Sequence, residues 1–266
     1  QSKNLFFSTM RKCLTLLTLL HPLAAAAFSP AGQKPPLNSF AVATRRSFLA
    51  YIPAAVLLPV GVANAAAGGT PSVAEGMSAF AAGDVERSVQ IYDAVIAADP
   101  RRIPYLWQRG LSLYYAGDYA AGAEQFAADV AVNPNDTEEQ IWHLLCLSRT
   151  PAVGSLTAAR PKKLAVGRDR RPVMRAAQAL FLGEADEKVL MDLAAGTDAG
   201  SRFYARLYLS LYYEATGDAG RAEEWMVRSV SGSGSDYATS FGAKDPMVEL
   251  ARVAVQRRGW SGTAVK

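Results

Sequence analysis

The chain matches itself when it is shifted by 34 residues, and this internal repeat limits the possible folds more than any other feature. The aligned positions are Gly76 with Gly110, Gly83 with Gly117, Asp84 with Asp118, Tyr92 with Phe126, and Pro100 with Pro134. A period of about 20 to 50 residues indicates short units that stack side by side and bury a shared core. We expect the two units, about 69–102 and 103–136, to be pairs of antiparallel helices.

Each repeated residue has a mechanical role in such a pair. A small residue at Gly76 or Gly110 lets the two helices approach closely, and a bulky ring in the second helix packs back onto the first. The glycine of each Gly-Asp turn accepts the left-handed conformation that ends a helix, and the aspartate caps the next one. The proline then stops the second helix. The pattern therefore predicts helix, turn and helix in each unit.

Beyond residue 136 the repeat weakens. Asp136 and Glu139 are spaced as in a capping box, which indicates that a helix begins there. The sequence predicts helices over 137–149, 172–182, 185–195, 202–216, 219–230 and 246–258, a long connection over 150–171 and a flexible Ser-Gly break over 231–235. Gly217-Asp218 repeats the turn, so we expect a third unit over 201–234 after degenerate helical pairs over 137–200. The last helix is expected to cap the open end of the stack.

The first 65 residues differ in charge from the rest of the chain. They hold 6 of the 28 basic residues and none of the 24 acidic ones, so 22 basic residues face 24 acidic ones in the remainder. The remainder is therefore net acidic by about two charges, although the whole chain has a net charge of +4. The basic character belongs to the leader and gives no support to nucleic-acid binding. About 200 residues remain, enough for one domain with its own core.

The leader divides into three segments. Residues 1–27 are predicted to be upstream residues plus a signal peptide, because Arg11-Lys12 precedes a short apolar run and four small residues. Residues 28–44 are rich in Pro, Ser and Ala without an acidic residue and resemble a transit peptide. Residues 45–65 combine Arg45-Arg46, an apolar run and Ala63-Asn64-Ala65, a pattern typical of a twin-arginine export signal.

The order of these segments resembles a known targeting route. A signal peptide whose removal leaves Phe28 at the new N-terminus resembles the leaders of algae with secondary, red-lineage plastids. The twin-arginine segment behind it resembles thylakoid-lumen targeting. The resemblance implies a plastid thylakoid-lumen location, with the mature protein soluble or peripherally attached to the membrane. A single bacterial twin-arginine leader with an extension, or a membrane anchor over 48–65, are the alternatives, although a spanning helix usually needs about 20 apolar residues.

The 34-residue period with these residues resembles the tetratricopeptide repeat. The resemblance implies that residues 66–260 form an all-α fold, a tetratricopeptide-like α-solenoid of antiparallel helix pairs with degenerate middle units and a C-terminal capping helix. The later segments, the helix with Trp142, residues 171–181, Phe203-Tyr204-Ala205 and residues 211–214, are similar to plastid tetratricopeptide-like proteins. They are more distantly similar to bacterial periplasmic tetratricopeptide lipoproteins, which act as adaptors for envelope hydrolases. The resemblance implies protein binding without catalysis and transfers no partner, since no Cys lies at the Ala65 cleavage point.

In a solenoid of this kind, the first helix of each unit lines a concave groove. The residues predicted to face the groove and bind a partner are Met77, Phe80, Trp107, Leu111, Tyr114, Ile141 and Leu145. An apolar, aromatic groove suits a helix or an extended peptide with hydrophobic anchors. Residues at this spacing are also typical of core packing, and a C-terminal helix that fills the groove is the alternative.

A second candidate surface is the basic segment 160–175. Its cations are Arg160, Lys162, Lys163, Arg168, Arg170, Arg171 and Arg175. Asp169 is the acidic residue among them, so in a net-acidic remainder this segment favours docking on an acidic protein surface or on anionic lipid head groups. The alternative is a solvated loop whose charges keep the protein soluble.

The residue types that catalysis needs are scarce after residue 65. Cys146 and His143 are the only cysteine and histidine there, and they share a helix. A zinc site needs three or four ligands, and a catalytic cysteine needs a base and an orienting third group. We therefore expect both residues to be structural. Phosphate-binding loops and nucleophile elbows are also missing from this sequence.

These observations together predict a protein that is not an enzyme, with no catalytic residue, no cofactor, no metal site and no nucleic-acid partner. The favoured hypothesis is a protein-binding scaffold or assembly factor in the thylakoid lumen, which serves photosynthetic complexes and contacts photosystem subunits. The alternative is an adaptor that delivers substrates to a lumenal protease.

Overall fold

The computed structural model describes residues 70–240 and 242–261, and the regular elements in those ranges are helical. The predicted signal, transit and export segments over 1–65 lie outside the described residues. A search of the described helices for one with the length and hydropathy of a membrane span finds none. The all-α class predicted from the repeat is confirmed for the described part of the chain.

The first four helices form two adjacent pairs. They are α1 (Val73–Ala81), α2 (Val85–Ala98), α3 (Trp107–Ala116) and α4 (Tyr119–Val132), and the 3-10 helix η1 (Pro100–Tyr105) joins the pairs. A Cβ atom on Gly76 would lie 2.6 Å from the ring of Tyr92, and a Cβ on Gly110 would lie 2.6 Å from the ring of Phe126. Since side chains do not tolerate such contacts, glycine is what allows each ring to approach its partner helix, as predicted.

The Gly-Asp turns have the predicted conformations. The φ angles are +81°, +86° and +89° at Gly83, Gly117 and Gly217, and the next residues, Asp84, Asp118 and Asp218, each accept a hydrogen bond from the backbone N–H three positions on. Glycine reaches positive φ without the steric penalty that other residues meet. The same local chemistry therefore makes the turn three times.

Replacing Gly110 with alanine is expected to lower the free energy of unfolding by up to about 2 kcal/mol. Alanine favours the helix by roughly 1 kcal/mol, but its methyl group would overlap the buried ring of Phe126, and overpacking a core costs about 1–3 kcal/mol. Gly220→Ala is the matched control, because its Cβ would meet no atom closer than 3.9 Å. Urea unfolding should show Gly220→Ala neutral or stabilising, and equal effects of the two substitutions would contradict the packing argument.

The segment between the second and third units contains α5 (Thr137–Arg149), α6 (Leu156–Ala159), the 3-10 helix η2 (Arg160–Lys162), α7 (Pro172–Leu182) and α8 (Lys188–Ala194). The predicted bounds of α5 and α7 are confirmed, whereas α8 is shorter than the predicted helix over 185–195. The predicted connection over 150–171 includes the two short helices α6 and η2. α5 packs against α4, α6 and α7, so the segment continues the stack of the first units.

The third pair consists of α9 (Ala199–Thr216) and α10 (Ala219–Val230), and α8 packs beside α9. Buried Ser210 donates a hydrogen bond of 2.6 Å to the carbonyl of Ala222, which holds the two helices close together. The predicted Ser-Gly break leads into the short helix α11 (Asp236–Thr239). The third unit predicted over 201–234 is therefore present as an adjacent helix pair.

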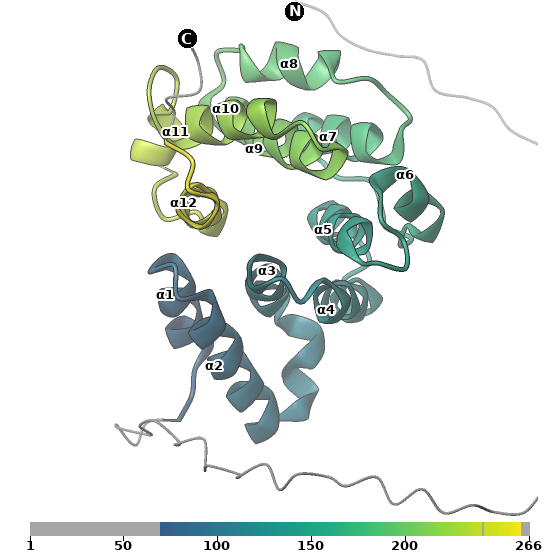
Figure 1. The fold of residues 1–266 in the computed structure, drawn as a ribbon, viewed down its shortest axis with the longest axis vertical. Helices are drawn as coiled ribbons and strands as arrows, with labels where there is room; N and C mark the ends of the chain where they lie inside the picture. The colour runs from purple at the N-terminus through teal and green to yellow at the C-terminus, as the bar shows by residue number, and fades with distance from the viewer. Residues whose placement is uncertain (1–69, 241, 262–266) are drawn as a thin grey trace, which may run out of the picture. The chain divides into compact units, whose positions relative to one another are not determined.

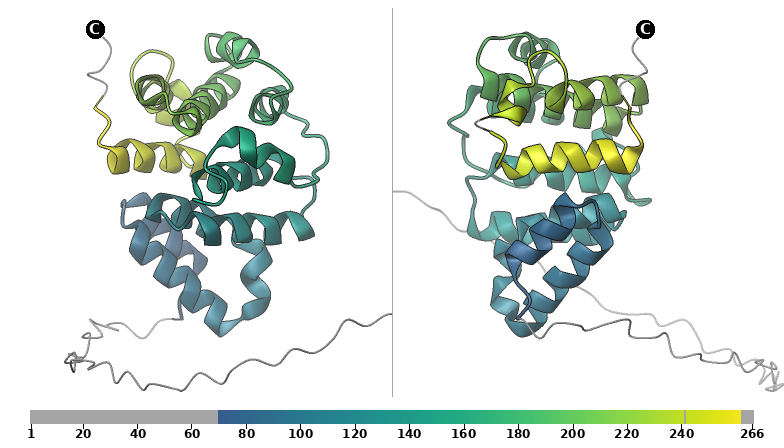
Figure 2. Two further views of the ribbon diagram at one scale, coloured as in Figure 1. Left: turned by 45° about the vertical axis from the view of Figure 1, so that its right-hand side comes forward. Right: turned by 90° about the vertical axis from the view of Figure 1, so that its left-hand side faces the viewer.

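The last helix, α12 (Pro246–Arg258), lies between the late helices and the beginning of the described chain. It packs against α10 of the third pair and also against α1 and α3 of the first two (Figure 1). The views in Figure 2 agree on this placement between the early and late helices. An ion pair of 2.5 Å joins Arg257 to Glu86 of α2. The expected C-terminal cap therefore covers the third pair and, beyond that expectation, contacts the first two.

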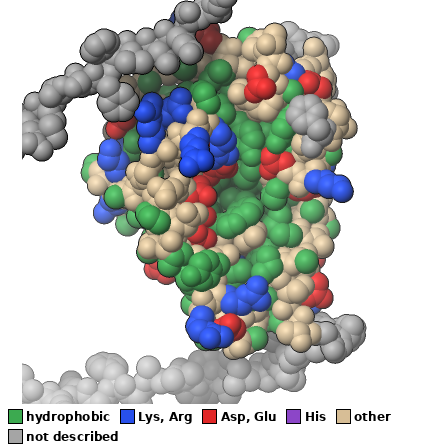
Figure 3. All heavy atoms as spheres, turned by 180° about the vertical axis from the view of Figure 1, so that it is seen from behind, with side chains coloured by type: hydrophobic (Ala, Val, Ile, Leu, Met, Phe, Trp, Pro, Cys, Tyr) green, Lys and Arg blue, Asp and Glu red, His purple; other side chains and the backbone are tan. Residues whose placement is uncertain are grey.

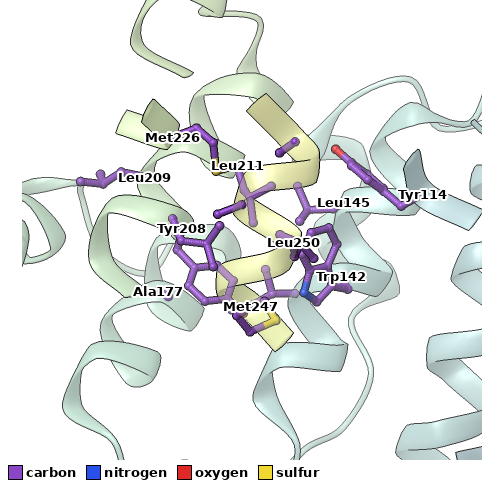
Figure 4. Packing of buried hydrophobic residues seen from close by; sticks show 14 of the residues in the cluster. Tyr114, Trp142, Leu145, Ala177, Tyr208, Leu209, Leu211, Met226, Met247 and Leu250 are labelled. Carbon is purple, nitrogen blue, oxygen red and sulfur yellow. The ribbon is translucent and has the colours of Figure 1, made fainter. Parts of the chain in front are cut away.

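The composition of α12 explains this position. Its buried residues are Met247, Val248, Leu250, Ala251, Val253 and Ala254. Figure 4 shows the large side chains of other helices around it, among them Tyr114, Trp142 and Tyr208. A helix with apolar residues over most of its circumference is stable only when neighbours surround it. The hydrophobic effect therefore places α12 in the concave side rather than at an exposed end.

Candidate functional site

Most of the predicted groove residues are buried, and α12 packs against two of the helices that carry them, α1 and α3. Phe80, Leu111, Tyr114, Ile141 and Leu145 are buried in the main hydrophobic core, and Met77 and Trp107 are half-buried. Because α12 fills the concave side, the five buried residues pack against other parts of the same chain. The alternative of a groove filled by the C-terminal helix describes this structure, and among the predicted groove residues only Met77 and Trp107 retain a surface that a partner can reach.

In the basic segment 160–175, some cations form hydrogen bonds or ion pairs within the fold, and others are exposed. Arg160 donates to the carbonyl of Phe181, Lys163 pairs with Glu184, Arg175 donates to the carbonyls of Asp169 and Arg170, and Arg171 pairs with Asp169 and Glu138. Lys162, Arg168 and Arg170 are exposed and make no side-chain hydrogen bond or ion pair within the described ranges. Four of the seven cations therefore have a role inside the fold.

Cys146 and His143 lie in the interior of α5. The Cys146 side chain is buried, and burial raises the pKa of its thiol, so the sulfur stays protonated. The Nδ1 atom of His143 is 3.0 Å from the carbonyl oxygen of Ala123, and burial lowers the pKa of the imidazole. The Cys146 sulfur faces Gly122, where an added Cβ would come within 2.9 Å of it. Both residues thus contribute to the α4–α5 contact.

One hollow in the described residues lies where three helices begin. Trp107 begins α3, Asp136 caps α5 and Asp245 caps α12, and all three residues line one cavity of about 250 Å³. The other lining residues are Leu111, Phe126, Glu138, Glu139, Trp142, Tyr204, Pro246 and Met247. Figure 3 shows this face of the molecule, where a hollow lined with hydrophobic side chains has acidic side chains at its edge. We call this cavity the N-terminal pocket.

One side of the N-terminal pocket is aromatic and rigid. The rings of Phe126 and Trp142 stack with centroids 6.2 Å apart, and Tyr114 meets the Trp142 ring edge-on at 5.2 Å. Figure 4 shows the nitrogen-bearing edge of Trp142 on the side where Met247 of α12 lies. The indole Nε1 of Trp142 is buried and has no hydrogen-bond partner. The pocket therefore has an aromatic wall formed by the Phe126 and Trp142 rings.

The opposite side carries carboxylates that are mostly occupied. Asp245 accepts hydrogen bonds of 2.8 Å from the hydroxyls of Tyr204 and Tyr237. Glu138 pairs with Arg171 at 2.6 Å and accepts a hydrogen bond of 2.9 Å from the Tyr208 hydroxyl. Negative charge at helix N-termini is also favoured by the helix dipole. Asp245 and Glu138 therefore stabilise the fold through these contacts.

Glu139 departs from this pattern, and the predicted capping box is wrong at this point. Asp136 accepts its hydrogen bond from the backbone N–H of Glu138, and the Glu139 side chain turns toward Asp129 of α4 instead of toward the cap. Glu139 and Asp129 are each only 4% exposed, and a side-chain hydrogen bond joins their carboxyl groups. Because the Glu139 side chain contacts Asp129 of α4, it does not accept a hydrogen bond from the backbone N–H of Asp136 as a capping box requires.

The two facing carboxyl groups hold a proton between them. Burial, followed by the charge of Asp129, raises the pKa of Glu139 to about 9, and burial also raises the pKa of Asp129. Two carboxylates at close range in a dry site do not both ionise at neutral pH. The pocket thus contains a protonated Glu139 at pH 7, beside an ionised or shared carboxyl at Asp129.

Stability is expected to fall as pH rises because of Glu139. The folded state keeps the proton up to about pH 9, whereas an unfolded glutamate loses it near its ordinary pKa of 4.5, so the stabilisation is complete below 4.5 and is lost toward 9. Glu139→Gln should remove this slope and raise the free energy of unfolding at pH 9 by roughly 2 kcal/mol relative to the parent. Urea titrations at pH 5, 7 and 9 measure it, with Glu224→Gln as the control, because Glu224 is partly exposed and pairs with Arg228. Parallel curves for both variants would contradict the assignment.

The sequence pointed to part of this pocket. Trp107 and Leu111 are among the predicted groove residues, and Asp136 and Glu139 give a helix-start signal in the sequence. Asp129, Trp142 and Asp245 carried no separate functional signal, since each fits an ordinary position in a helix or at its cap. These residues become neighbours only because the helices that carry them, which are distant along the chain, pack together in the fold.

Comparisons with known proteins add no constraint to this geometry. No protein-family model matches the chain, and no curated protein matches it in sequence. Within residues 70–240 and 242–261, no group of three or more His, Cys, Asp or Glu side chains is arranged to hold a metal ion.

Proposed function

We propose that this chain is a non-catalytic, tetratricopeptide-like protein that binds other polypeptides in the plastid thylakoid lumen, as a scaffold or assembly factor for photosynthetic complexes. The observation that carries the binding proposal is the N-terminal pocket, where the partly exposed Trp107 stands beside the buried ring of Trp142 and the acidic side chains of Glu138 and Glu139. The proposed location rests on the targeting-like segments 28–44 and 45–65.

The helical scaffold supports this proposal in two further ways. Paired helices at a constant spacing place pocket residues on rigid elements, which favours recognition of a partner without much reordering. The exposed cations Lys162, Arg168 and Arg170 are free to meet an acidic partner surface and to accelerate association. Fold alone does not define function, so the pocket and not the repeat carries the argument.

Photo-crosslinking tests the binding proposal directly. A photoreactive phenylalanine derivative replaces Trp107, which preserves an aromatic ring at the pocket, and a second variant carries it at Val189 of α8, an apolar side chain that is 51% exposed. Both are irradiated in thylakoid-lumen extract, and the adducts are identified by mass spectrometry. Photosystem subunits captured at position 107 and absent at 189 support the scaffold, a processing protease supports an adaptor role, and identical products at both positions contradict binding at the pocket.

The location proposal has its own test. Residues 1–70 are fused to a fluorescent protein in an alga with a secondary plastid, and we expect the fusion to reach the thylakoid lumen. Replacing Arg45 and Arg46 with lysines should stop it before the thylakoid membrane, because twin-arginine export depends on that pair. Fluorescence outside the plastid for the parent fusion would refute the location.

A further inference from the structure

The exposed cations of the basic segment stand on a backbone that is held against α5. Residues 163–169 form no regular element, and two of them contact the first half of that helix. Gln140 donates a hydrogen bond to the carbonyl of Leu164, and Thr137, at the start of α5, donates one of 2.6 Å to Asp169. Because these contacts are made to a packed helix, the exposed side chains of the segment are presented from fixed backbone positions.

Asp169 separates two of these cations and turns inward. Its side chain is 8% exposed and binds Thr137 and Arg171, whereas Arg168 and Arg170 on either side of it are exposed. Inward and outward side chains alternate in this way along an extended chain. The two arginines therefore lie two residues apart on the solvent side of the segment.

Lys162 belongs to the same stretch of surface. Its backbone lies beside the imidazole of His143, whereas Asp169 contacts Thr137 six residues earlier on α5. Six helical residues span about 9 Å, which is comparable to the distance over which physiological salt screens a charge. Lys162, Arg168 and Arg170 can therefore act together on one ligand, and we call these three residues the basic patch.

The surroundings of the basic patch leave its positive charge uncompensated. Among the described residues, the carboxylates that pair with segment 160–175 are Asp169, Glu138 and Glu184, and their partners are Lys163 and Arg171. Seven cations of the segment thus face three carboxylates, and three of those cations form the patch. Since the chain after residue 65 is net acidic, this local surplus attracts a negatively charged partner to one place on the surface.

The segment that carries the basic patch reaches the edge of the N-terminal pocket. Arg171 pairs with Glu138 at 2.6 Å, and its guanidinium lies over the ring of Tyr204, 5.6 Å from the centroid. Glu138 and Tyr204 both line the pocket. Figure 3 shows basic side chains gathered beside the hydrophobic hollow. A partner bound at the pocket therefore has a positively charged surface next to it.

The distribution of charge favours a short acidic segment of a polypeptide over a membrane or a nucleic acid. An extended anionic surface or polymer also meets the acidic side of the pocket, where Asp136, Glu138 and Asp245 lie, and the net charge of the protein repels it. A few carboxylates within a polypeptide meet the patch without covering that acidic side. Exposed arginines also bind carboxylates through two parallel hydrogen bonds.

We propose that the basic patch binds an acidic segment of a partner polypeptide, whose carboxylates pair with Lys162, Arg168 and Arg170 beside the N-terminal pocket. This inference rests on the proposed protein-binding function and names the chemistry of the partner. Ion pairs between exposed groups are weakened by salt, so the contact tightens at low ionic strength and loosens at high ionic strength.

Two capped peptides test the proposal, acetyl-Gly-Glu-Ser-Glu-Ser-Glu-Gly-amide and the same peptide with glutamine in place of each glutamate. The readout is the backbone amide signals of the 15N-labelled protein. With the glutamate peptide we expect saturable shifts for residues 162–171 and none for α1, which carries no cation. The glutamine peptide should bind about tenfold more weakly at about 50 mM salt, and the difference should shrink at about 500 mM salt.

A triple variant with Lys162→Gln, Arg168→Gln and Arg170→Gln should bind the glutamate peptide about tenfold more weakly than the parent. Unchanged amide signals of α1 and α12 show that the variant is folded. The matched control removes the same charge from three exposed arginines outside the segment, Arg87, Arg102 and Arg228. This control, with glutamine at those positions, should bind the glutamate peptide like the parent.

Equal binding of the two peptides, no shifts in residues 162–171, or equal losses in the two triple variants would overturn the proposal. Sedimentation of the parent with phosphatidylglycerol vesicles, without binding of the glutamate peptide, would also overturn it and would identify a membrane as the ligand. Capture of a photosystem subunit at position 107 without binding of the glutamate peptide overturns this inference alone. Binding of the glutamate peptide at residues 162–171, with identical crosslinks at positions 107 and 189, supports the patch and removes the pocket.

Discussion

Replacing Arg206 with methionine should lower the free energy of unfolding by about 3–5 kcal/mol. Arg206 is 5% exposed, and its guanidinium donates to the carbonyls of Ala194, Arg228, Ser233 and Gly234 at 2.7–3.2 Å. These carbonyls lie at the end of α8, in the last turn of α10 and in the Ser-Gly break. Methionine fills a similar volume but donates nothing, so one buried and three part-buried acceptors lose their partner.

Arg228→Met is the matched control for Arg206. The Arg228 side chain is 48% exposed and pairs with Glu224 one turn earlier on α10, an arrangement worth at most about 0.5 kcal/mol. Guanidinium chloride unfolding followed by far-ultraviolet circular dichroism measures both variants. Similar, small losses for the two arginines would show that the carbonyl cluster does not depend on Arg206.

Leu250→Ala should destabilise the protein by about 3–4 kcal/mol. Leu250 is fully buried in α12, and Figure 4 shows it among side chains of α5, α9 and α10. Truncating a buried leucine removes its transfer free energy and leaves a cavity that a packed interior closes only in part. Because α12 contacts both the early and the late helices, the loss should appear as one cooperative transition at lower denaturant.

Arg252→Ala on the same helix separates packing from helix propensity. Its side chain is 42% exposed and pairs with Glu249, so its removal should change the stability by less than about 1 kcal/mol. A dispensable cap would give a different result, with a small effect of Leu250→Ala and an early, separate transition for α12. Two resolved transitions would therefore refute the interpretation of α12 as a core element.

The position of α12 also bears on how a partner can be recognised. Tyr114, Ile141 and Leu145 are buried in the hydrophobic core. A partner helix or strand therefore cannot contact them unless α12 moves away. The N-terminal pocket needs no such displacement, since it is open where α3, α5 and α12 begin. Binding of a partner at this pocket is therefore compatible with the packed core.

Local sequence rules predicted the helices well because their causes are local. The Gly-Asp turns, the proline at the start of α7 and the Asp245-Pro246 start of α12 act within one or two turns of the chain, and each appears where it was expected. The predicted bounds were least accurate at α8 and within the connection 150–171. There the helices are short, and tertiary contacts decide their length.

The sequence by itself determined the all-α class, the pairing of helices through Gly76 and Gly110 with their facing rings, and most helix boundaries, because these depend on propensity, capping and a periodic pattern. Only the tertiary structure decided that α12 fills the concave side, and that Glu139 faces Asp129 beside Trp142. Those contacts join residues that are distant along the chain, and they depend on how whole helices pack together. The repeat therefore specifies the pairs, and the burial of one apolar helix specifies where a pocket remains.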